Sequence, residues 1–257
     1  MKHIVSYSGG LNSFAVAERI VAKYGKENVL CIFTDTKSED EDLYRFITET
    51  IVYLGCEYQV LADGRNLWGV FNSMNFMSNS RVDNCSQILK RSLFKRWLKK
   101  AYKPSECIIY MGFDWNEEHR LPKVVKRYKP YRVEAPLLEK PYLDKSAIME
   151  RLKTIGIRHP RLYDLGFAHN NCGGFCVKTG QAQFRLLYKK LPERYSYHEQ
   201  EQEKLFERIG PHGFIRVTEG GVLRYLSMKE FRVEFLEKED CDKRVDLFDF
   251  GGCGCFV

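Results

Sequence analysis

The sequence predicts an α/β protein with a doubly wound, mostly parallel sheet. Over the first 155 residues, apolar segments of strand length alternate with amphipathic segments of helix length. The strand segments, such as VLCIFTDT at residues 29–36, are almost continuously apolar, as expected when helices cover both faces of a sheet. The first strand runs directly into a glycine–serine turn and a helix (SYSGGLNS, residues 6–13). In such a sheet, ligands bind at the carboxyl ends of the strands.

The expected elements follow one another along the first half of the chain. Strands are predicted at residues 3–8, 29–36, 57–64, 107–113 and 131–137, and helices at residues 11–25, 40–55, 86–102 and 144–155. Gly25 ends the first helix, and Asp144 is the expected N-cap of the last. The alternation breaks near His159, where Gly, Asn, Pro and Cys become frequent.

The second half of the chain is expected to be a different unit. The sequence predicts a structured loop region, a mostly helical stretch and two short strands at residues 159–180, 181–209, 213–217 and 222–226. We therefore expect an α/β nucleotide-binding domain at residues 1–160. A cysteine-rich extension of helical and irregular α+β structure is expected at residues 161–257.

Composition places the chain among soluble globular proteins. It has 257 residues, of which 44% are hydrophobic. No apolar run approaches the ~20 residues that a membrane-spanning helix needs. The apolar stretch after Lys2 and His3 is too short for a secretory signal peptide. We expect a cytoplasmic protein without a membrane partner.

The net charge of +7 is concentrated in two tracts, at residues 90–103 and 123–132. The first tract (KRSLFKRWLKKAYK) has seven basic side chains, and neither tract has an acidic one. Aromatic residues lie between the cations, namely Trp97, Tyr102, Tyr128 and Tyr131. One interpretation is a polyanion site for tRNA or DNA, with phosphates on the cations and bases on the rings. The alternative is the solvated face of a helix and a surface loop.

The turn at residues 6–13 has the chemistry of a phosphate-binding loop. Glycines allow the main chain to approach phosphate oxygens, and the start of a helix presents its N–H groups and positive dipole end. The loop has no Walker-type lysine. Alone, the turn is equally compatible with a tight connection between strand and helix.

Five segments in order give the chain a resemblance to a known family. SYSGGLNS is similar to the SGGxDS loop of the PP-loop ATP pyrophosphatases, in the adenine nucleotide α-hydrolase-like superfamily. FTDT followed by Glu41 and DLYRF resembles the phosphoadenosine phosphosulfate (PAPS) reductase-like branch of that superfamily. The other matching segments are CSQILKRSLFKRWL, MGFDWNEEHR and RLYDLGFAHNNCGGFC, at residues 85–98, 111–120 and 161–176. The pattern also resembles PAPS reductase-like proteins of phages and mobile elements.

The resemblance implies roles for particular residues, with ATP or a PAPS-like adenosine nucleotide and Mg²⁺ as cofactors. The residues that it assigns to nucleotide binding are Ser6, Ser8, Gly9, Gly10, Asn12, Ser13, Asp35, Thr36 and Gly112. It assigns catalytic roles to Lys90 and Arg120, as cations on the phosphates or leaving group, and to the thiol of Cys85. Asn12 departs from the family pattern because it replaces the aspartate of SGGxDS, and Leu11 stands where lysine is frequent.

The chain has nine cysteines, and clustered cysteines in a reducing compartment favour metal or thiol chemistry. Cys31, Cys56 and Cys107 lie in apolar runs and are expected to pack in the core. The candidate metal ligands are Cys85, Cys172, Cys176, Cys253 and Cys255. They could hold a [4Fe–4S] cluster through three or four thiolates. Alternatively, the last four could hold zinc and leave Cys85 a separate thiol, or no metal is bound. His169 is a further ligand candidate.

Three functions are compatible with these residues. The leading one is adenylation of an acceptor, tRNA or DNA, with release of pyrophosphate, followed by sulfur or a similar nucleophile from a donor partner. The second is a true sulfonucleotide reductase that releases sulfite with a thioredoxin-like partner, although its C-terminal ECG[LI]H-type motif is missing. The third is a binding module that has lost catalysis, which the substitution at Asn12 supports. Oligomerisation is compatible with all three.

Overall fold

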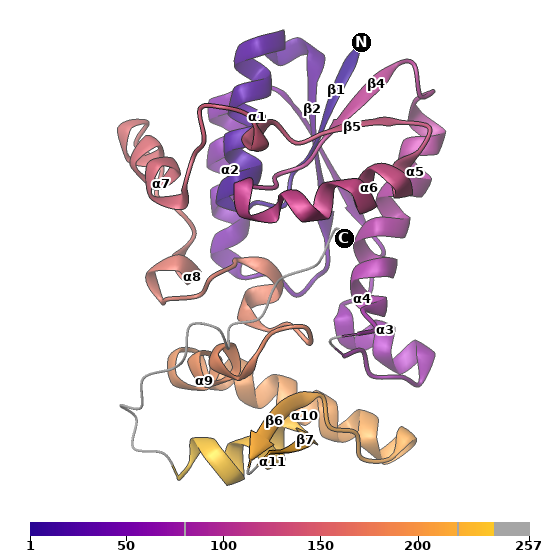
Figure 1. Cartoon of the computed structure of the whole chain (residues 1–257), viewed down its shortest axis with the longest axis vertical. Coiled ribbons are helices and arrows are strands. Elements are labelled where there is room, and N and C mark those ends of the chain that lie inside the picture. Colours follow the sequence, from indigo (N-terminus) through magenta and orange to yellow (C-terminus); the bar gives the residue numbers. More distant parts are fainter. Residues whose placement is uncertain (80, 220, 239–257) are drawn as a thin grey trace.

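A five-stranded parallel sheet forms the centre of the N-terminal half of the molecule (Figure 1). The computed structural model describes residues 1–79, 81–219 and 221–238. The strands are β1 (Lys2–Ser6), β2 (Val29–Asp35), β3 (Glu57–Ala62), β4 (Cys107–Tyr110) and β5 (Arg132–Glu134). Their order in the sheet is β3-β2-β1-β4-β5, with every neighbouring pair parallel. The predicted doubly wound α/β fold is confirmed.

Helices cover both faces of this sheet. The helices of this half are α1 (Leu11–Tyr24), α2 (Glu41–Leu54), α3 (Leu67–Met74), α4 (Asn84–Ser86), α5 (Leu93–Ala101), α6 (Leu121–Tyr128), α7 (Lys145–Thr154) and α8 (Arg161–Asp164). Neighbouring residues of β1 pack on opposite faces of the sheet. Val5 packs into a core with α1, α2 and α7, whereas Ile4 packs into a second core with α5 and α6. Both side chains are fully buried.

Several element boundaries differ from the sequence-based expectation. The helix expected at residues 86–102 is continuous from Asn84 to Ala101 but contains a π-helical segment, η2 (Gln87–Ser92). The last strand ends early at Glu134, because Pro136 begins the 3₁₀ turn η4 (Pro136–Leu138) and cannot donate to a ladder. Neither α3 nor α6 was expected. The α6 segment carries so many basic residues that its apolar face is short, with Val124 and Tyr128 buried.

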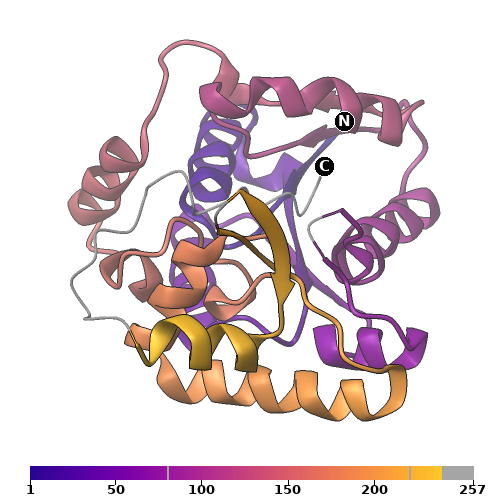
Figure 2. The same cartoon turned by 60° about the horizontal axis from the view of Figure 1, so that its bottom comes forward.

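The C-terminal part gathers below the sheet, at one end of the molecule (Figures 1 and 2). It consists of α9 (Gln181–Lys190), α10 (Pro192–Ile209), the antiparallel hairpin β6 (Ile215–Glu219) and β7 (Val222–Leu226), and α11 (Met228–Phe231). Its apolar core includes residues of α3, and the indole N–H of Trp68 donates to Nδ1 of His198 at 2.9 Å. Packing therefore runs across the boundary expected near residue 160. Among the described residues, no helix is both long and apolar enough to span a bilayer.

A buried carboxylate joins the two parts. Asp40 is fully buried and caps the N-terminus of α2, where it accepts a hydrogen bond from the backbone of Asp42. It also forms ion pairs with Arg161 at 2.8 Å and with Arg194 of α10 at 2.8 Å. Burial by itself would raise the pKa of Asp40, but the hydrogen bonds from the two arginines outweigh it and hold the pKa below its ordinary value.

We predict that Asp40→Asn lowers the free energy of unfolding by about 2–3 kcal/mol, because it leaves two guanidinium groups without their buried partner while preserving the helix cap. Since the folded-state pKa is lowered, the stabilisation is present above pH ~4 and is lost as pH falls through the lowered pKa. Urea denaturation at pH 7 and pH 3 measures both effects. Glu41→Gln is the control, because Glu41 pairs with the same arginines but its side chain is 82% exposed, so a loss below about 1 kcal/mol is expected. Equal losses would contradict the role of Asp40.

Candidate functional site

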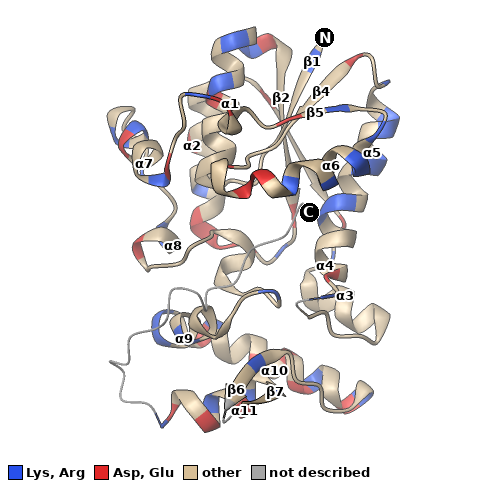
Figure 3. Cartoon of the chain, viewed as in Figure 1, with Lys and Arg blue, Asp and Glu red and all other residues tan. Residues whose placement is uncertain are grey.

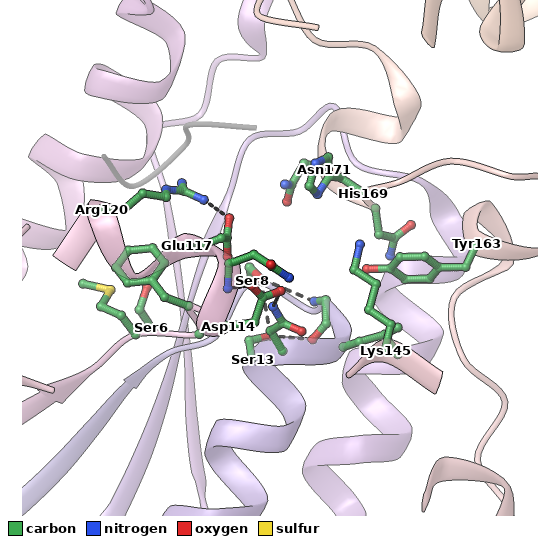
Figure 4. Close-up of a pocket in the computed structure, with 18 residues that line it drawn as sticks. Ser6, Ser8, Ser13, Asp114, Glu117, Arg120, Lys145, Tyr163, His169 and Asn171 are labelled. Carbon is green, nitrogen blue, oxygen red and sulfur yellow. Dashed lines mark hydrogen bonds and ion pairs between the residues drawn. The ribbon is translucent and has the colours of Figure 1, made fainter. Parts of the chain in front are cut away.

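A cavity of about 240 Å³ opens where the strand order of the sheet reverses. The chain leaves β1 toward β2 on one side and later returns to place β4 on the other side of β1. Ligands of open α/β sheets bind at such a point, outside the carboxyl ends of the strands. Here the cavity is lined by the segments that follow β1 and β4, and its opposite wall comes from α7, α8 and the loop after α8 (Figure 4).

The loop after β1 has the geometry that its glycines and serines predict. Gly9 has φ +73°, and a Cβ there would collide with the side chains of Leu43 and Ile47 on α2. Only glycine fits this backbone conformation without strain. The hydroxyl of Ser13 donates to the carbonyl oxygen of Gly10 at 2.8 Å, and the hydroxyl of Ser8 lies 3.3 Å from that of Ser13. The loop thus holds two hydroxyls together at the edge of the cavity.

The N-terminus of α1 is the positive end that faces this cavity. Gly10 is its N-cap and supplies no capping side chain, and the first turn contains no acidic residue. The neighbouring α2 is different, because Asp40 caps it and Glu41 and Asp42 occupy its first turn. A helix N-terminus attracts anions through its dipole and its unpaired N–H groups. Of these two helices, only α1 leaves that end available to an anionic ligand.

Asn12 and Asp114 meet beside the loop. The side-chain amide of Asn12 donates to Oδ2 of Asp114 at 3.3 Å, and Oδ1 of Asp114 accepts from the backbone of Asn116 at 3.0 Å. This contact requires close approach of the two strand ends. A Cβ on Gly112 would lie 3.1 Å from the backbone nitrogen of Ser13. A carboxylate from the segment after β4 therefore lies beside the loop at Asn12.

Cations and neutral polar groups form the rest of the cavity. Figure 4 shows Lys145 and Tyr163 on the side facing Ser8 and Asp114. The ammonium of Lys145 donates to the carbonyl oxygen of Ala168 at 2.7 Å, which fixes it against this wall. Arg120 forms an ion pair with Glu117 and lies over the ring of Phe113.

His169 contributes an uncharged ring to the same wall. Burial, together with the charges of Lys145 and Arg120, lowers the pKa of His169 to about 4. The imidazole is therefore neutral at pH 7. The sequence had suggested this side chain as a metal ligand, but the structure places it on the cavity.

The structure brings together most, though not all, of the expected nucleotide-binding residues. Those that line the cavity are Ser6, Ser8, Gly10, Asn12, Ser13 and Gly112, and Arg120, which was expected as a catalytic cation, lines it too. Gly9 shapes the loop from behind. Asp35 is engaged elsewhere, since its carboxylate accepts from the backbone of Lys37 at 2.8 Å and from the hydroxyl of Tyr44 at 2.9 Å.

Lys90 and Thr36 meet at a different place. Lys90 has an almost fully buried side chain, 3.5 Å from the carboxylate of Glu39, and the hydroxyl of Thr36 donates to the same carboxylate at 2.9 Å. Both line a second, narrow cavity of about 20 Å³ rather than the first. The loop from His169 to Cys176 separates the two cavities, because its first three residues line one and its cysteines line the other.

Cys85, Cys172 and Cys176 all line this second cavity. These three candidate ligands therefore lie around one cavity, and Glu39 accepts a hydrogen bond from the backbone of Cys172 at 2.6 Å. Within residues 1–79, 81–219 and 221–238, however, no group of three or more His, Cys, Asp or Glu side chains is arranged to hold a metal ion. Cys253 and Cys255 lie outside the described residues. The described residues alone thus do not fit an iron–sulfur cluster or a zinc ion.

The two basic tracts lie next to each other on the outer helices of the sheet (Figure 3). The ammonium of Lys95 in α5 donates to the carbonyl oxygen of Arg127 in α6 at 3.0 Å. The exposed basic residues of the tracts are Arg96, Lys99, Lys100, Lys103, Lys123, Lys126, Lys129 and Arg132. Stacking of bases on Tyr128 and Tyr131, which the sequence suggested, is wrong, because both rings are buried in the core.

Sequence reasoning missed several residues of the first cavity. Asp114 and Tyr163 stood inside the motifs that carried the resemblance, but nothing marked them individually. Lys145 follows the helix cap Asp144, and its position alone could not show that it faces the loop after β1. Asn170 is buried on the cavity wall, and only tertiary packing reveals this.

Comparisons with known proteins give the following likenesses. No protein-family model matches the chain, and no curated protein matches it. It is similar to a PAPS reductase from Candida auris in complex with phosphate, with 15% identity, a TM-score of 0.48, and coverage of 66% of this chain and 81% of that one. The motifs of the sequence resemble those of the same family.

Two synthetases are also similar. An NMN synthetase from Francisella tularensis has 16% identity and a TM-score of 0.41, over 61% of this chain and 62% of that one. An NH₃-dependent NAD synthetase from Campylobacter jejuni has 14% identity and a TM-score of 0.40, over 81% of this chain and 83% of that one. At such identities and scores, these likenesses support no argument about reaction or substrate.

We predict that Asn12→Asp destabilises the metal-free protein by about 1 kcal/mol, because it places a second carboxylate against Asp114. For a chain of this size, the melting temperature should fall by roughly 2–4 °C. The exchanged pair Asn12→Asp with Asp114→Asn restores the amide–carboxylate contact and should restore the melting temperature. Differential scanning calorimetry in EDTA measures all three proteins. An unchanged single variant would show that the two side chains do not interact.

Proposed function

We propose that the first cavity binds an adenosine nucleotide and adenylates an acceptor with release of pyrophosphate. The observation that carries this proposal is the uncapped N-terminus of α1, which opens onto the cavity with the hydroxyls of Ser8 and Ser13 beside it and Lys145 opposite. Backbone N–H groups, hydroxyls and a cation are the groups that hold phosphate oxygens. The motif resemblance to the PP-loop ATP pyrophosphatases supports the same function.

The residues of the cavity can support such a transfer by positioning and charge. In phosphoryl and nucleotidyl transfer, positioned cations stabilise the charge that develops on the phosphate oxygens. Lys145 is held by Ala168, and Arg120 by Glu117. Mg²⁺ fits this site, because it binds through one or two carboxylates together with phosphate oxygens. Asp114 would hold it, and the ion would neutralise phosphate charge.

The acceptor in this proposal is a nucleic acid bound along the basic face. Arg120 lines the cavity and directly precedes α6, so the exposed Lys123 and Lys126 continue from the mouth of the cavity. The exposed cations of α5 lie beside α6. A row of such cations binds the phosphates of a polyanion without reading its sequence. An acceptor held there would reach the activated phosphate from the cavity mouth.

A sulfur nucleophile is the proposed second substrate, displacing AMP from the adenylated acceptor. Its support is the second cavity, where Cys85, Cys172 and Cys176 lie across one loop from the nucleotide site. No step is assigned to a metal at these thiols, because the described residues around them do not form a metal-holding group. The alternative, a sulfonucleotide reductase in which a thiol takes sulfite from PAPS, is favoured by the same thiols.

We predict that the protein converts ATP to AMP and pyrophosphate, faster when RNA or DNA is added. Lys145→Met should slow this reaction at least about 100-fold, because it removes a positioned cation and keeps the aliphatic stem. The control is Lys153→Met on the same helix, whose side chain is 64% exposed and pairs with Glu150, and it should keep the wild-type rate. Ion-exchange chromatography of the nucleotides measures the products. Sulfite release from PAPS with a dithiol, without ATP turnover, would replace this function with the reductase.

We predict that Lys99→Gln, Lys100→Gln and Lys126→Gln together weaken binding to single-stranded RNA and double-stranded DNA of any sequence. Each lost phosphate contact should also reduce the slope of log affinity against log salt by about 1. Fluorescence anisotropy between low and physiological salt measures both quantities. Lys204→Gln on α10, with a 66% exposed side chain, is the control. An unchanged slope in the triple variant would exclude the α5–α6 face as the polyanion site.

A further inference from the structure

Asn170 carries a buried amide with no protein partner, on the wall of the nucleotide cavity. The residue is 4% exposed, and neither its Nδ2 nor its Oδ1 has a hydrogen-bond partner among residues 1–79, 81–219 and 221–238. Leaving a buried amide unpaired costs about 1–3 kcal/mol, and native proteins seldom leave such groups unsatisfied. An unpaired amide on the cavity wall points to a partner supplied by the cavity, either a ligand or water.

The chemistry of the amide restricts that partner. Nδ2 needs an acceptor and Oδ1 needs a donor, and the two atoms lie side by side in one plane. A phosphate or sulfate oxygen can accept from Nδ2 but has no hydrogen for Oδ1. A single ligand that satisfies both atoms presents a donor and an acceptor next to each other, as the edge of a nucleobase does. Asparagine forms such a paired contact with the N6 and N7 atoms of adenine.

The surroundings of Asn170 favour a flat, uncharged group. His169 adds no charge to this wall, because burial lowers the pKa of its imidazole and keeps the ring unprotonated at pH 7. The ring of Tyr163 lines the same cavity, and its hydroxyl lies 3.6 Å from the Cβ position of Gly10. Aromatic and imidazole rings provide surfaces on which bases stack. The cations Lys145 and Arg120 remain available for phosphate.

We infer that Asn170 binds the edge of a nucleobase through paired hydrogen bonds to its side-chain amide, next to the rings of Tyr163 and His169. This inference rests on the proposed function, which places nucleotide phosphates at α1. The base belongs either to the bound nucleotide or to the nucleic-acid acceptor. The two sources share the chemistry of the edge, and the test below separates them.

The first variant to make is Asn170→Leu, which has a similar volume and no polar atoms. Because it removes an amide without an internal partner, the melting temperature should stay the same or rise. Tyr128→Phe is the matched control. The hydroxyl of Tyr128 is also buried without a partner among the described residues but lies away from the cavity, so its removal should leave every ligand affinity unchanged.

Isothermal titration calorimetry tests whether Asn170 contacts the base of the bound nucleotide. Wild type and Asn170→Leu are each titrated with ATP and with purine riboside triphosphate, which lacks the 6-amino group. A loss of roughly tenfold to a hundredfold for ATP, and a clearly smaller loss for the analogue, which keeps the N7 acceptor, assigns Asn170 to that base. Titration with single-stranded oligoribonucleotides of each base tests the acceptor. A similar loss confined to one oligonucleotide assigns Asn170 to the acceptor. Asn170→Asp, which keeps the shape but lacks the donor, should show the same losses.

Three results would overturn the inference. The first is that Asn170→Leu binds every probe as tightly as wild type. The second is that Asn170→Leu lowers the melting temperature by several degrees while Tyr128→Phe does not, which would indicate an internal partner. A loss that occurs with ATP but vanishes with 2′,3′-dideoxyATP would assign the amide to ribose hydroxyls instead. If wild type binds no ATP, the proposed function fails, whereas the oligonucleotide titrations still decide the role of Asn170.

Discussion

The buried carboxylate of Asp40 is the contact on which the geometry of the site depends. It joins the start of α2 to Arg161 at one end of the cavity wall and to Arg194 in the C-terminal helix α10. The neighbouring Glu39 accepts from the backbone of Cys172 at the other end of the wall. Two adjacent carboxylates thus hold the segment that presents the cavity's outer wall. The outer wall is thereby connected both to α2 and, through Arg194, to the C-terminal part.

The electrostatics of the cavity follow from how two neighbouring helices begin. Asp40 satisfies the positive end of α2 from within the protein, while α1 begins at a glycine and leaves its positive end facing the cavity. Lys145 and Arg120 add charge of the same sign, and these cations help to keep His169 neutral. Asp114 and Glu117 line the same cavity and offset these cations, so the positive end of α1 is the feature that favours an anionic group.

The sequence alone predicted the sheet, the loop after β1 and the position of that loop at a strand end. These features follow from the alternation of strand and helix segments and from the glycines of the loop, which are local properties. The sequence alone did not predict features that depend on which side chains are buried. Lys90 and Asp35 have the residue types of a nucleotide site, yet each is held by protein partners. Tyr128 and Tyr131 lie among cations in the sequence, but Tyr128 at the end of α6 and Tyr131 just before β5 are both buried in the core. No local pattern shows which face of a short basic helix will pack.

The contact between Asn12 and Asp114 changes what the loop's departure from its family pattern means. Read along the sequence, Asn12 removes a carboxylate from the site and supports a protein that has lost catalysis. In the folded chain, a carboxylate lies 3.3 Å from that amide, supplied from a strand end 102 residues away. Asp114 is also held by the backbone of Asn116, which restricts its side chain more than an exposed loop would. The folded chain therefore has a carboxylate beside the loop although Asn12 itself carries no charge, and the residue at position 12 alone does not describe the electrostatics of the site.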